Sequence, residues 1–294
     1  MTTIQLSELA MNVATYIICR TAVDHQDRLL SDERFSIALA FLERATTTHL
    51  CNHKLTREGI VYEYQGEPFR LKEEYKTITL TRSVYEHLAM FYYLYEHPRT
   101  VVERDIVWKY WLINSKLGKL GAYKGKDPQI LGEIRTTREE IKHLRQEILA
   151  TPVGQACGKE LQRLISSNNT QTGSLQIRRH GEKYLLQRLS FSQAWRWLYP
   201  EADGGDGLLS LEYRYLSMHS HPVYDGLLQY QSQADVTDDD EQESLFFSSC
   251  FLARLCSLFL RQIPQGEQLL AHRFSREEQF AFYALAQMKG VGKE

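Results

Sequence analysis

Apolar residues recur at spacings of three and four along most of the 294-residue chain, which is the period of an amphipathic α-helix. Capping chemistry agrees with this period, because Ser31, Asp32 and Glu33 separate the first two helical segments and Pro98 ends the strongest one. We therefore expect an all-α protein built as a multi-helix bundle. The pattern predicts helices over about 4–30, 32–56, 71–96, 100–117, 128–150, 152–166, 208–221, 244–262 and 275–288.

Two stretches depart from the helical period. Residues 59–70 alternate loosely around Gln65-Gly66, which favours a small β-hairpin or an extended loop, and residues 175–199 are mixed in pattern. Little other sheet is expected. The polar, glycine-containing stretch SSNNTQTGS is typical of a connector, so we place a boundary between an N-terminal helical part, 1–166, and a C-terminal helical part, 167–294. One single domain is the alternative.

The most apolar stretch is Leu245–Leu260, which Arg254 interrupts. A helix needs roughly 20 apolar residues to span a bilayer, so this shorter stretch predicts a buried core helix. The first residues carry no basic region ahead of an apolar run, so we expect no secretory signal. Both observations predict a soluble protein without a membrane partner.

Composition narrows the function classes only slightly. Hydrophobic residues make up 43% of the chain, which is enough for a substantial core, and 35 basic against 37 acidic residues give a formal charge of -2. The whole chain therefore lacks the basic excess typical of nucleic-acid-binding proteins, although a local basic patch is compatible with it. Five cysteines without a CxxC pair argue against a disulfide framework or a zinc site. We expect reduced thiols, a cytoplasmic location, and neither metal nor cofactor.

The helix predicted over 71–96 is apolar on nearly its whole circumference, so we expect it at the centre of the bundle. Arg82 and Glu86 lie four residues apart on one of its faces, within reach of each other. An exposed pair is an ordinary helix salt bridge. A buried pair must offset a desolvation penalty of several kcal/mol per ion, which makes it a candidate site as well as a structural element.

A second polar row lies on the helix predicted over 208–221. Tyr213, Ser217 and His221 repeat at four-residue intervals, opposite an apolar stripe, and align a phenol, a hydroxyl and an imidazole. Pro222 disfavours helical geometry at His221, so a residue capping the helix C-terminus is the structural alternative for this histidine.

The two motifs together resemble a widespread family of bacterial all-helical proteins whose members have no established activity. The likeness covers roughly residues 75–225 and depends on an Arg-x-x-x-Glu motif followed far downstream by Tyr-x-x-x-Ser-x-x-x-His. It implies a helical fold in which the two rows face each other. The matching residues are Arg82, Glu86, Tyr213, Ser217 and His221.

The chain is also similar to the HEPN helical ribonucleases, whose catalytic motif is an arginine followed by four to six residues and a histidine. Two side chains five positions apart in a regular helix point about 140° from each other, so only a kink or a helix end lets them converge. The analogy therefore favours Arg214 and His221, next to Pro222. The spacing also fits Arg20–His25, Arg44–His49, Arg82–His87, Arg138–His143 and Arg214–His219.

Basic and aromatic residues gather between 178 and 197. Such a group can form a surface on which single-stranded nucleic acid stacks, so RNA is among the partners that the sequence allows; an ordinary amphipathic surface is the alternative. The residues are Arg178, Arg179, His180, Lys183, Trp195, Arg196 and Trp197.

Two functions fit these patterns. The first is binding of a small ligand or a protein partner at a polar site inside the bundle, or a purely structural role of that site, and the residue pattern slightly favours it. The second is a metal-independent HEPN-like endoribonuclease in which His221 is the general acid or base and Arg82 or Arg214 stabilises a phosphate. In both cases Arg82 and Glu86 should form hydrogen bonds with at least two of Tyr213, Ser217 and His221. An oligomer is compatible with either function.

Overall fold

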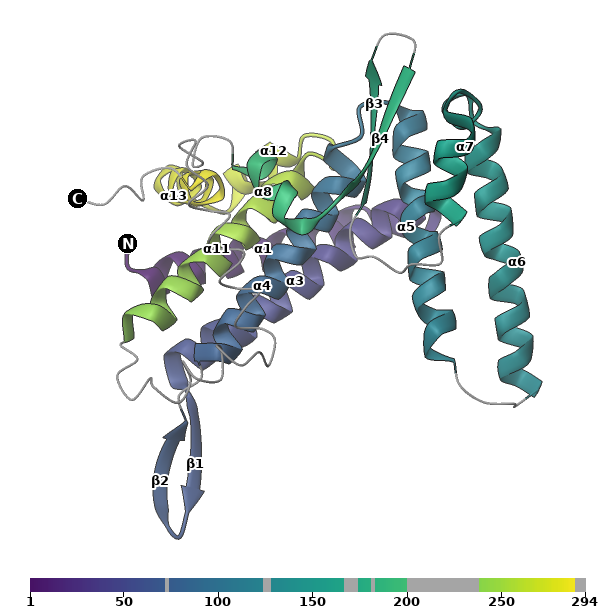
Figure 1. Ribbon diagram of the computed structural model, residues 1–294. Coiled ribbons are helices and arrows are strands. Elements are labelled where there is room, and N and C mark those ends of the chain that lie inside the picture. The colour runs from purple at the N-terminus through teal and green to yellow at the C-terminus, as the bar shows by residue number, and fades with distance from the viewer. Residues whose placement is uncertain (72–73, 124–127, 167–173, 181–182, 200–237, 289–294) are drawn as a thin grey trace. The chain divides into compact units, whose positions relative to one another are not determined.

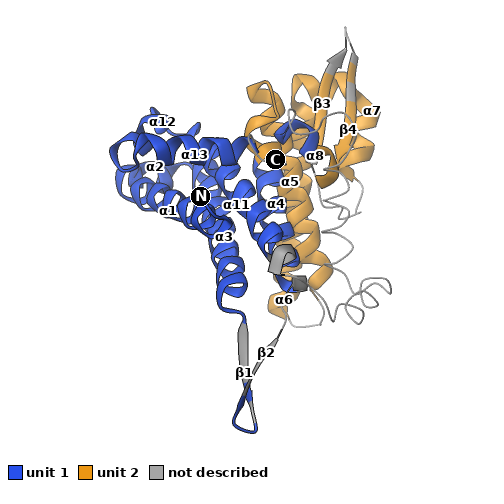
Figure 2. Ribbon diagram, turned by 90° about the vertical axis from the view of Figure 1, so that its left-hand side faces the viewer, with its two compact units in different colours: residues 1–91, 195–294 blue, residues 92–194 orange. Residues whose placement is uncertain are grey.

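The computed structural model describes residues 1–71, 74–123, 128–166, 174–180, 183–199 and 238–288 (Figure 1). The chain divides into two compact units (Figure 2). Unit 1 combines Met1–Phe91 with Trp195–Glu294, and unit 2 is Tyr92–Ala194. The boundary expected at 166–167 falls inside unit 2.

Unit 1 is a helical bundle in which α11 is the central element, because it contacts α1, α3 and α4. The helix α13 packs on α1 and α11. The mainly helical fold predicted from the apolar spacing is therefore confirmed. The helices of unit 1 are α1 (Thr3–Asp24), α2 (Gln26–Ser31), α3 (Glu33–Glu58), α4 (Glu74–Phe91), α11 (Asp238–Leu260), α12 (Gly266–Leu269) and α13 (Arg276–Gln287).

Side-chain caps start several of these helices. The Asp32 carboxylate accepts a hydrogen bond from the backbone N–H of Phe35 at 3.1 Å, as the capping signal before α3 predicted. Thr2 and Ser275 form reciprocal capping boxes with the residues three positions later, at the starts of α1 and α13. These local bonds explain why the helix starts could be read from the sequence.

The two most apolar helices lie in the core. On α4, Val84, Tyr85 and Leu88 are fully buried although they point in different directions, which confirms its central place. The helix α11 is longer than its apolar stretch, and Gln242–Leu260 is long and apolar enough to cross a membrane, with a mean hydropathy of 1.4. However, 72% of that window is buried inside the protein. The predicted core position is confirmed, whereas the expectation that length alone excludes a span was wrong.

The hairpin expected near 59–70 is present. Strands β1 (Ile60–Tyr64) and β2 (Glu67–Leu71) pair antiparallel, with Tyr64 opposite Glu67. The two-residue turn between them has positive φ at both Gln65 and Gly66, 55° and 84°, which matches the right-handed twist of a hairpin.

Unit 2 contains the π-helical turn η1 (Tyr92–Glu96), the long helices α5 (Val101–Ala122) and α6 (Pro128–Ala150), and α7 (Pro152–Ser166). The helix α8 (Phe191–Leu198) crosses the boundary to unit 1. A second hairpin covers α5 and α7, with β3 (Ser174–His180) paired to β4 (Lys183–Leu189). The core residues of unit 2 are Ile106, Tyr110, Ile113, Ile141, Ile148, Val153, Leu161, Ile165, Leu175 and Ile177.

The β3–β4 hairpin corrects the expectation of little sheet outside 59–70. The apolar positions of this segment do not alternate cleanly, and short apolar runs are ambiguous between helix and strand. The tertiary contacts decide, because Leu175 and Ile177 are buried against the helices while Arg178 is exposed.

Candidate functional site

The predicted pair on α4 forms an ion pair. The Nε of Arg82 lies 2.8 Å from Oε1 of Glu86, and the two side chains are 17% and 32% exposed. The four-residue spacing therefore brought them together as expected. The pair lies at a half-buried edge of a helix whose other faces are buried, so water still screens its charges in part.

The other half of the predicted site, Tyr213, Arg214, Ser217 and His221, lies outside the described residues. Its meeting with the pair on α4 stays a prediction. Another arginine and histidine that fit the ribonuclease spacing, Arg82 and His87, can be followed. The ring Nδ1 of His87 bonds to the carbonyl of Ser83 at 2.6 Å, whereas Arg82 bonds to Glu86, so each side chain is held by a different neighbour.

A chain of buried hydrogen bonds links three helices of unit 1. The hydroxyl of Ser7 on α1 bonds both to Nε2 of His49 at 3.0 Å and to Nδ1 of His53 at 2.9 Å. Nδ1 of His49 in turn bonds to the hydroxyl of Ser248 on α11 at 2.8 Å. Because a hydroxyl has one proton, Ser7 donates to one ring and accepts from the other. All four side chains are at most 5% exposed.

A second set of buried polar contacts lies one helical turn along α3. The amide nitrogen of Asn52 donates to the Thr81 hydroxyl at 2.8 Å, and that hydroxyl reaches the carbonyl of Ser244 on α11 at 3.0 Å. The side-chain oxygen of Asn52 and the hydroxyl of Thr56 have no partner among the described residues. Sequence reasoning missed this group, although His49, Asn52 and Thr56 share one face of α3 by their spacing.

Burial keeps the two histidines of this chain neutral. Desolvation is the main cause that lowers the pKa of His49 to about 3, and the hydrogen bond from Ser7 opposes it only in part. Desolvation also lowers the pKa of His53. No carboxylate bonds to these rings in the described part of the chain, so neither ring is oriented as a general base for a serine nucleophile. The arrangement instead fixes how α1, α3 and α11 align.

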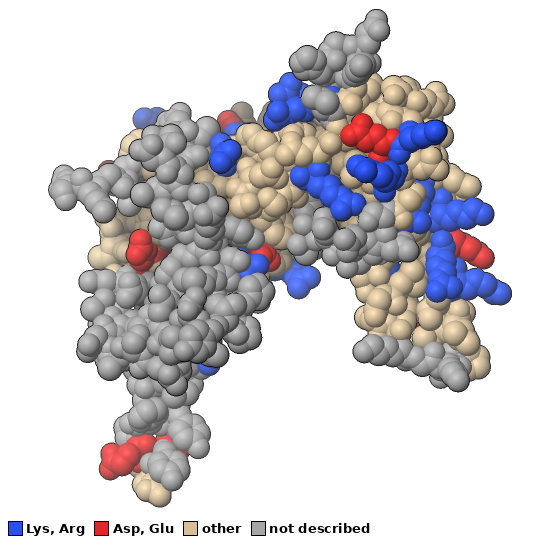
Figure 3. Space-filling view, in the orientation of Figure 1, with Lys and Arg blue, Asp and Glu red and all other residues tan. Residues whose placement is uncertain are grey.

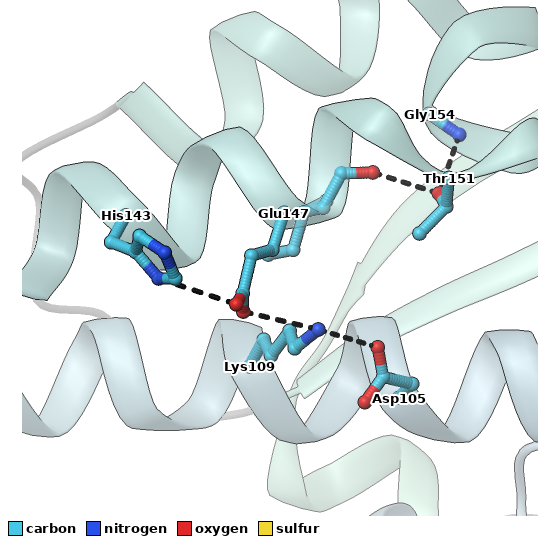
Figure 4. A network of polar contacts seen from close by, with 7 residues as sticks. Asp105, Lys109, His143, Glu147, Thr151 and Gly154 are labelled. Carbon is cyan, nitrogen blue, oxygen red and sulfur yellow. Dashed lines mark hydrogen bonds and ion pairs between the residues drawn. The ribbon is translucent and has the colours of Figure 1, made fainter.

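A seam of ion pairs joins α5 to α6 in unit 2. Nζ of Lys109 lies 2.8 Å from Asp105 and 3.1 Å from Glu147, and Nδ1 of His143 lies 3.2 Å from Glu147 (Figure 4). Two further lysines pair with carboxylates placed seven and fourteen residues earlier on α6 than Glu147. These pairs are Lys116–Glu140 at 2.6 Å and Lys119–Glu133 at 3.5 Å.

The seam assigns the two sides of α6 to opposite charges. Glu133, Glu140 and Glu147 lie on the side that faces α5, where they neutralise lysines. At about 100° per residue, Arg138 and Lys142 project roughly opposite to Glu133. Arg135 lies on the same outer side, and all three of these cations are exposed. None of the three has an ion-pair partner within the described part of the chain.

Unit 2 as a whole is basic and unit 1 is acidic. Unit 2 contains 17 Lys and Arg against 10 Asp and Glu, a formal charge of +7. The two segments of unit 1 contain 18 against 27, a formal charge of -9. Figure 3 shows Lys and Arg side chains gathered over α6 and α7. We call the exposed cations of these two helices the basic surface; they are Arg135, Arg138, Lys142, Lys159 and Arg163.

Two other arginines of unit 2 hold the fold together. Nε of Arg145 donates to the carbonyl of Ile165 at 2.8 Å, and Nη2 of Arg188 donates to the carbonyl of Leu164 at 3.4 Å. Both carbonyls belong to the last turn of α7, where backbone acceptors lack helical partners and cations are favoured by the helix dipole. These arginines are therefore not counted in the basic surface.

The basic and aromatic surface expected over 178–197 does not form as predicted. Trp195 belongs to unit 1 and is 1% exposed, packed against Tyr85 and Phe251 with ring centroids 5.2 and 5.4 Å away. Its large apolar ring is more stable in the core than in water. Of the basic residues, Arg178 is exposed on β3.

Among the described residues, no group of three or more His, Cys, Asp or Glu side chains is placed to hold a metal ion. No family of known proteins, no curated protein and no solved structure matches this chain. The basic surface and the buried polar chain are thus the two features whose chemistry bears on function.

Proposed function

We propose that this chain is a nucleic-acid-binding protein whose unit 2 provides the binding surface. The observation that carries the proposal is the segregation of charge, with +7 on unit 2 and -9 on unit 1. Attraction between cations and phosphates dominates affinity for nucleic acids, and a cluster of exposed Lys and Arg on one face is its usual footprint. A soluble, cytoplasmic protein with reduced cysteines fits this role.

The way α6 distributes its charges supports this surface as a binding site. Its carboxylates face inward and neutralise α5, whereas Arg135, Arg138 and Lys142 face outward without ion-pair partners in the described part of the chain. A cation that only solubilises the protein needs no such sorting. A row of outward cations with the acids turned away presents a uniform positive edge to a polyanion.

Binding fits the described residues better than cleavage or capture of a small ligand. The buried chain through His49 is closed to solvent, and each of its hydroxyls is already bonded to a ring. Arg82 and Glu86 bond to each other. The HEPN-like ribonuclease proposal depends on Arg214 and His221, so RNA cleavage is scored in the same experiment as RNA binding.

The test is fluorescence anisotropy with a labelled RNA of about 20 nucleotides at low salt, with gel analysis of the RNA afterwards. The variant R135E/R138E/K142E should bind at least about tenfold more weakly than the parent, because each reversal removes a phosphate contact and adds repulsion. The matched control R44E/K54E/R276E reverses three exposed cations of unit 1 and alters net charge equally. It should change affinity less than about threefold.

Three outcomes would overturn the proposal. The first is a parent protein that binds no RNA at low salt. The second is an equal loss in both triple variants, which would mean that only net charge matters. The third is binding confined to vesicles of anionic lipid, which would make the surface a membrane contact. Shortened RNA that disappears in H221A would instead support the ribonuclease alternative.

A further inference from the structure

We infer that the basic surface selects single-stranded nucleic acid over duplex, an inference that rests on the proposed function. It starts from the shape of the cation row on α6. Arg135, Arg138 and Lys142 stand three and four residues apart, so the row rises about 10.5 Å along one side of the helix. The row is one side chain wide, which suits one phosphate backbone.

Acidic side chains border this row. Glu139 follows directly after Arg138 and lines the same part of the surface, and the carboxylates of Glu133 and Glu140 occupy the α5 side of the helix. A duplex brings a second phosphate backbone alongside the first, and proteins that bind duplex RNA contact backbones across two successive grooves. On α6 that second backbone would meet carboxylates and be repelled. A single strand avoids this repulsion.

A shallow hollow beside the row provides a second, independent reason. It has a volume of about 420 Å³ and is lined by Leu131, Ile134 and Glu139 together with the three cations. Leu131 is 51% exposed, which is unusually far for a large apolar side chain on a helix. Aliphatic and guanidinium groups together offer an apolar and cationic platform to a flat aromatic ring.

An unpaired base can occupy such a hollow, whereas a paired base cannot. In a duplex the faces of each base are covered by its stacked neighbours, and the edges point into the grooves. In a single strand a base can turn out and lay one face on the platform while its phosphates lie along the cations. The hollow and the narrow row therefore agree on the same class of ligand.

The experiment compares three labelled probes of equal length, namely single-stranded RNA, single-stranded DNA and duplex RNA, over a range of salt concentrations. The single strands should bind at least about tenfold tighter than the duplex at each salt concentration. Three phosphate contacts predict a slope of log affinity against log salt of about -2 for the single strands.

A variant separates the hollow from the charges. L131S removes the apolar platform without changing charge and should weaken single-strand binding about fivefold, with the salt slope and duplex binding unchanged. The matched control is L30S, which alters an exposed leucine of unit 1 and should leave both affinities unchanged. Circular dichroism of both variants checks that they fold.

The outcomes distinguish this inference from the proposed function. Duplex RNA that binds as tightly as the single strands overturns the inference and leaves nucleic-acid binding by unit 2 intact. The same holds if L131S and L30S behave alike. If no nucleic acid binds, the proposed function fails and the inference fails with it.

Discussion

Acid should destabilise this protein through His49, the imidazole at the middle of the buried hydrogen-bond chain. The perturbation is H49Q, which replaces the ring by an amide that cannot be protonated in this range but can still donate and accept hydrogen bonds. Burial lowers the pKa of His49 to about 3 in the folded protein, against the ordinary pKa of 6.5 for an exposed ring. The unfolded chain therefore binds a proton at mild acidity and the folded chain does not.

The sign and size of the effect follow from this difference. Because the folded pKa is lowered, stability is full above pH 6.5 and is lost as the pH falls from 6.5 towards 3. At pH 5 the unfolded state gains about 2 kcal/mol from protonating His49, and below pH 3 the loss would approach about 5 kcal/mol. The parent should therefore lose about 2 kcal/mol more than H49Q between pH 7 and pH 5.

Urea denaturation at pH 7 and pH 5, followed by circular dichroism, measures this difference. H143Q is the matched control, because the side chain of His143 is 71% exposed and water solvates its charge in both states. H143Q should keep the pH dependence of the parent. If the parent and H49Q lose the same free energy of unfolding between the two pH values, the reasoning about the buried chain is refuted.

Other predictions concern packing and the predicted pair. G154A should lower the free energy of unfolding by about 2 kcal/mol or more, because the added Cβ would lie 2.2 Å from the carbonyl oxygen of Ile148. G118A, in open space on α5, should instead raise it by about 0.5–1 kcal/mol; thermal melts that rank these two variants the other way would contradict the packing. R82A should cost about 1–2 kcal/mol by leaving a half-buried Glu86, and a melt identical to that of the parent would make the pair a surface feature.

The helices were predictable because their signals are local. Asp32 caps α3 within three residues, Pro128 starts α6 where its missing N–H costs nothing, and Gln65-Gly66 allows the positive φ of a tight turn. The Arg82–Glu86 pair was predictable for the same reason, since one helical turn brings its members together. Whether Tyr213, Ser217 and His221 join it is still a prediction from spacing.

Features that depend on distant segments could not be read in this way. The bond between His49 and Ser248 joins positions 199 apart in the sequence, and a histidine on an amphipathic helix does not reveal which helix will cover it. The β3–β4 hairpin forms because Leu175 and Ile177 find an apolar surface on the helices of unit 2. Local propensity leaves such short segments undecided.

The charge pattern shows the division most clearly. The sequence by itself determined a near-neutral, mainly helical chain, and a boundary at 166–167 gives its two parts charges of only +2 and -4. Tertiary structure decided that both ends of the chain build one unit, because the apolar helix α11 can bury its surface only against α1, α3 and α4. That packing gathers the acidic residues of both ends into unit 1 and leaves the basic middle of the chain as unit 2, with charges of -9 and +7.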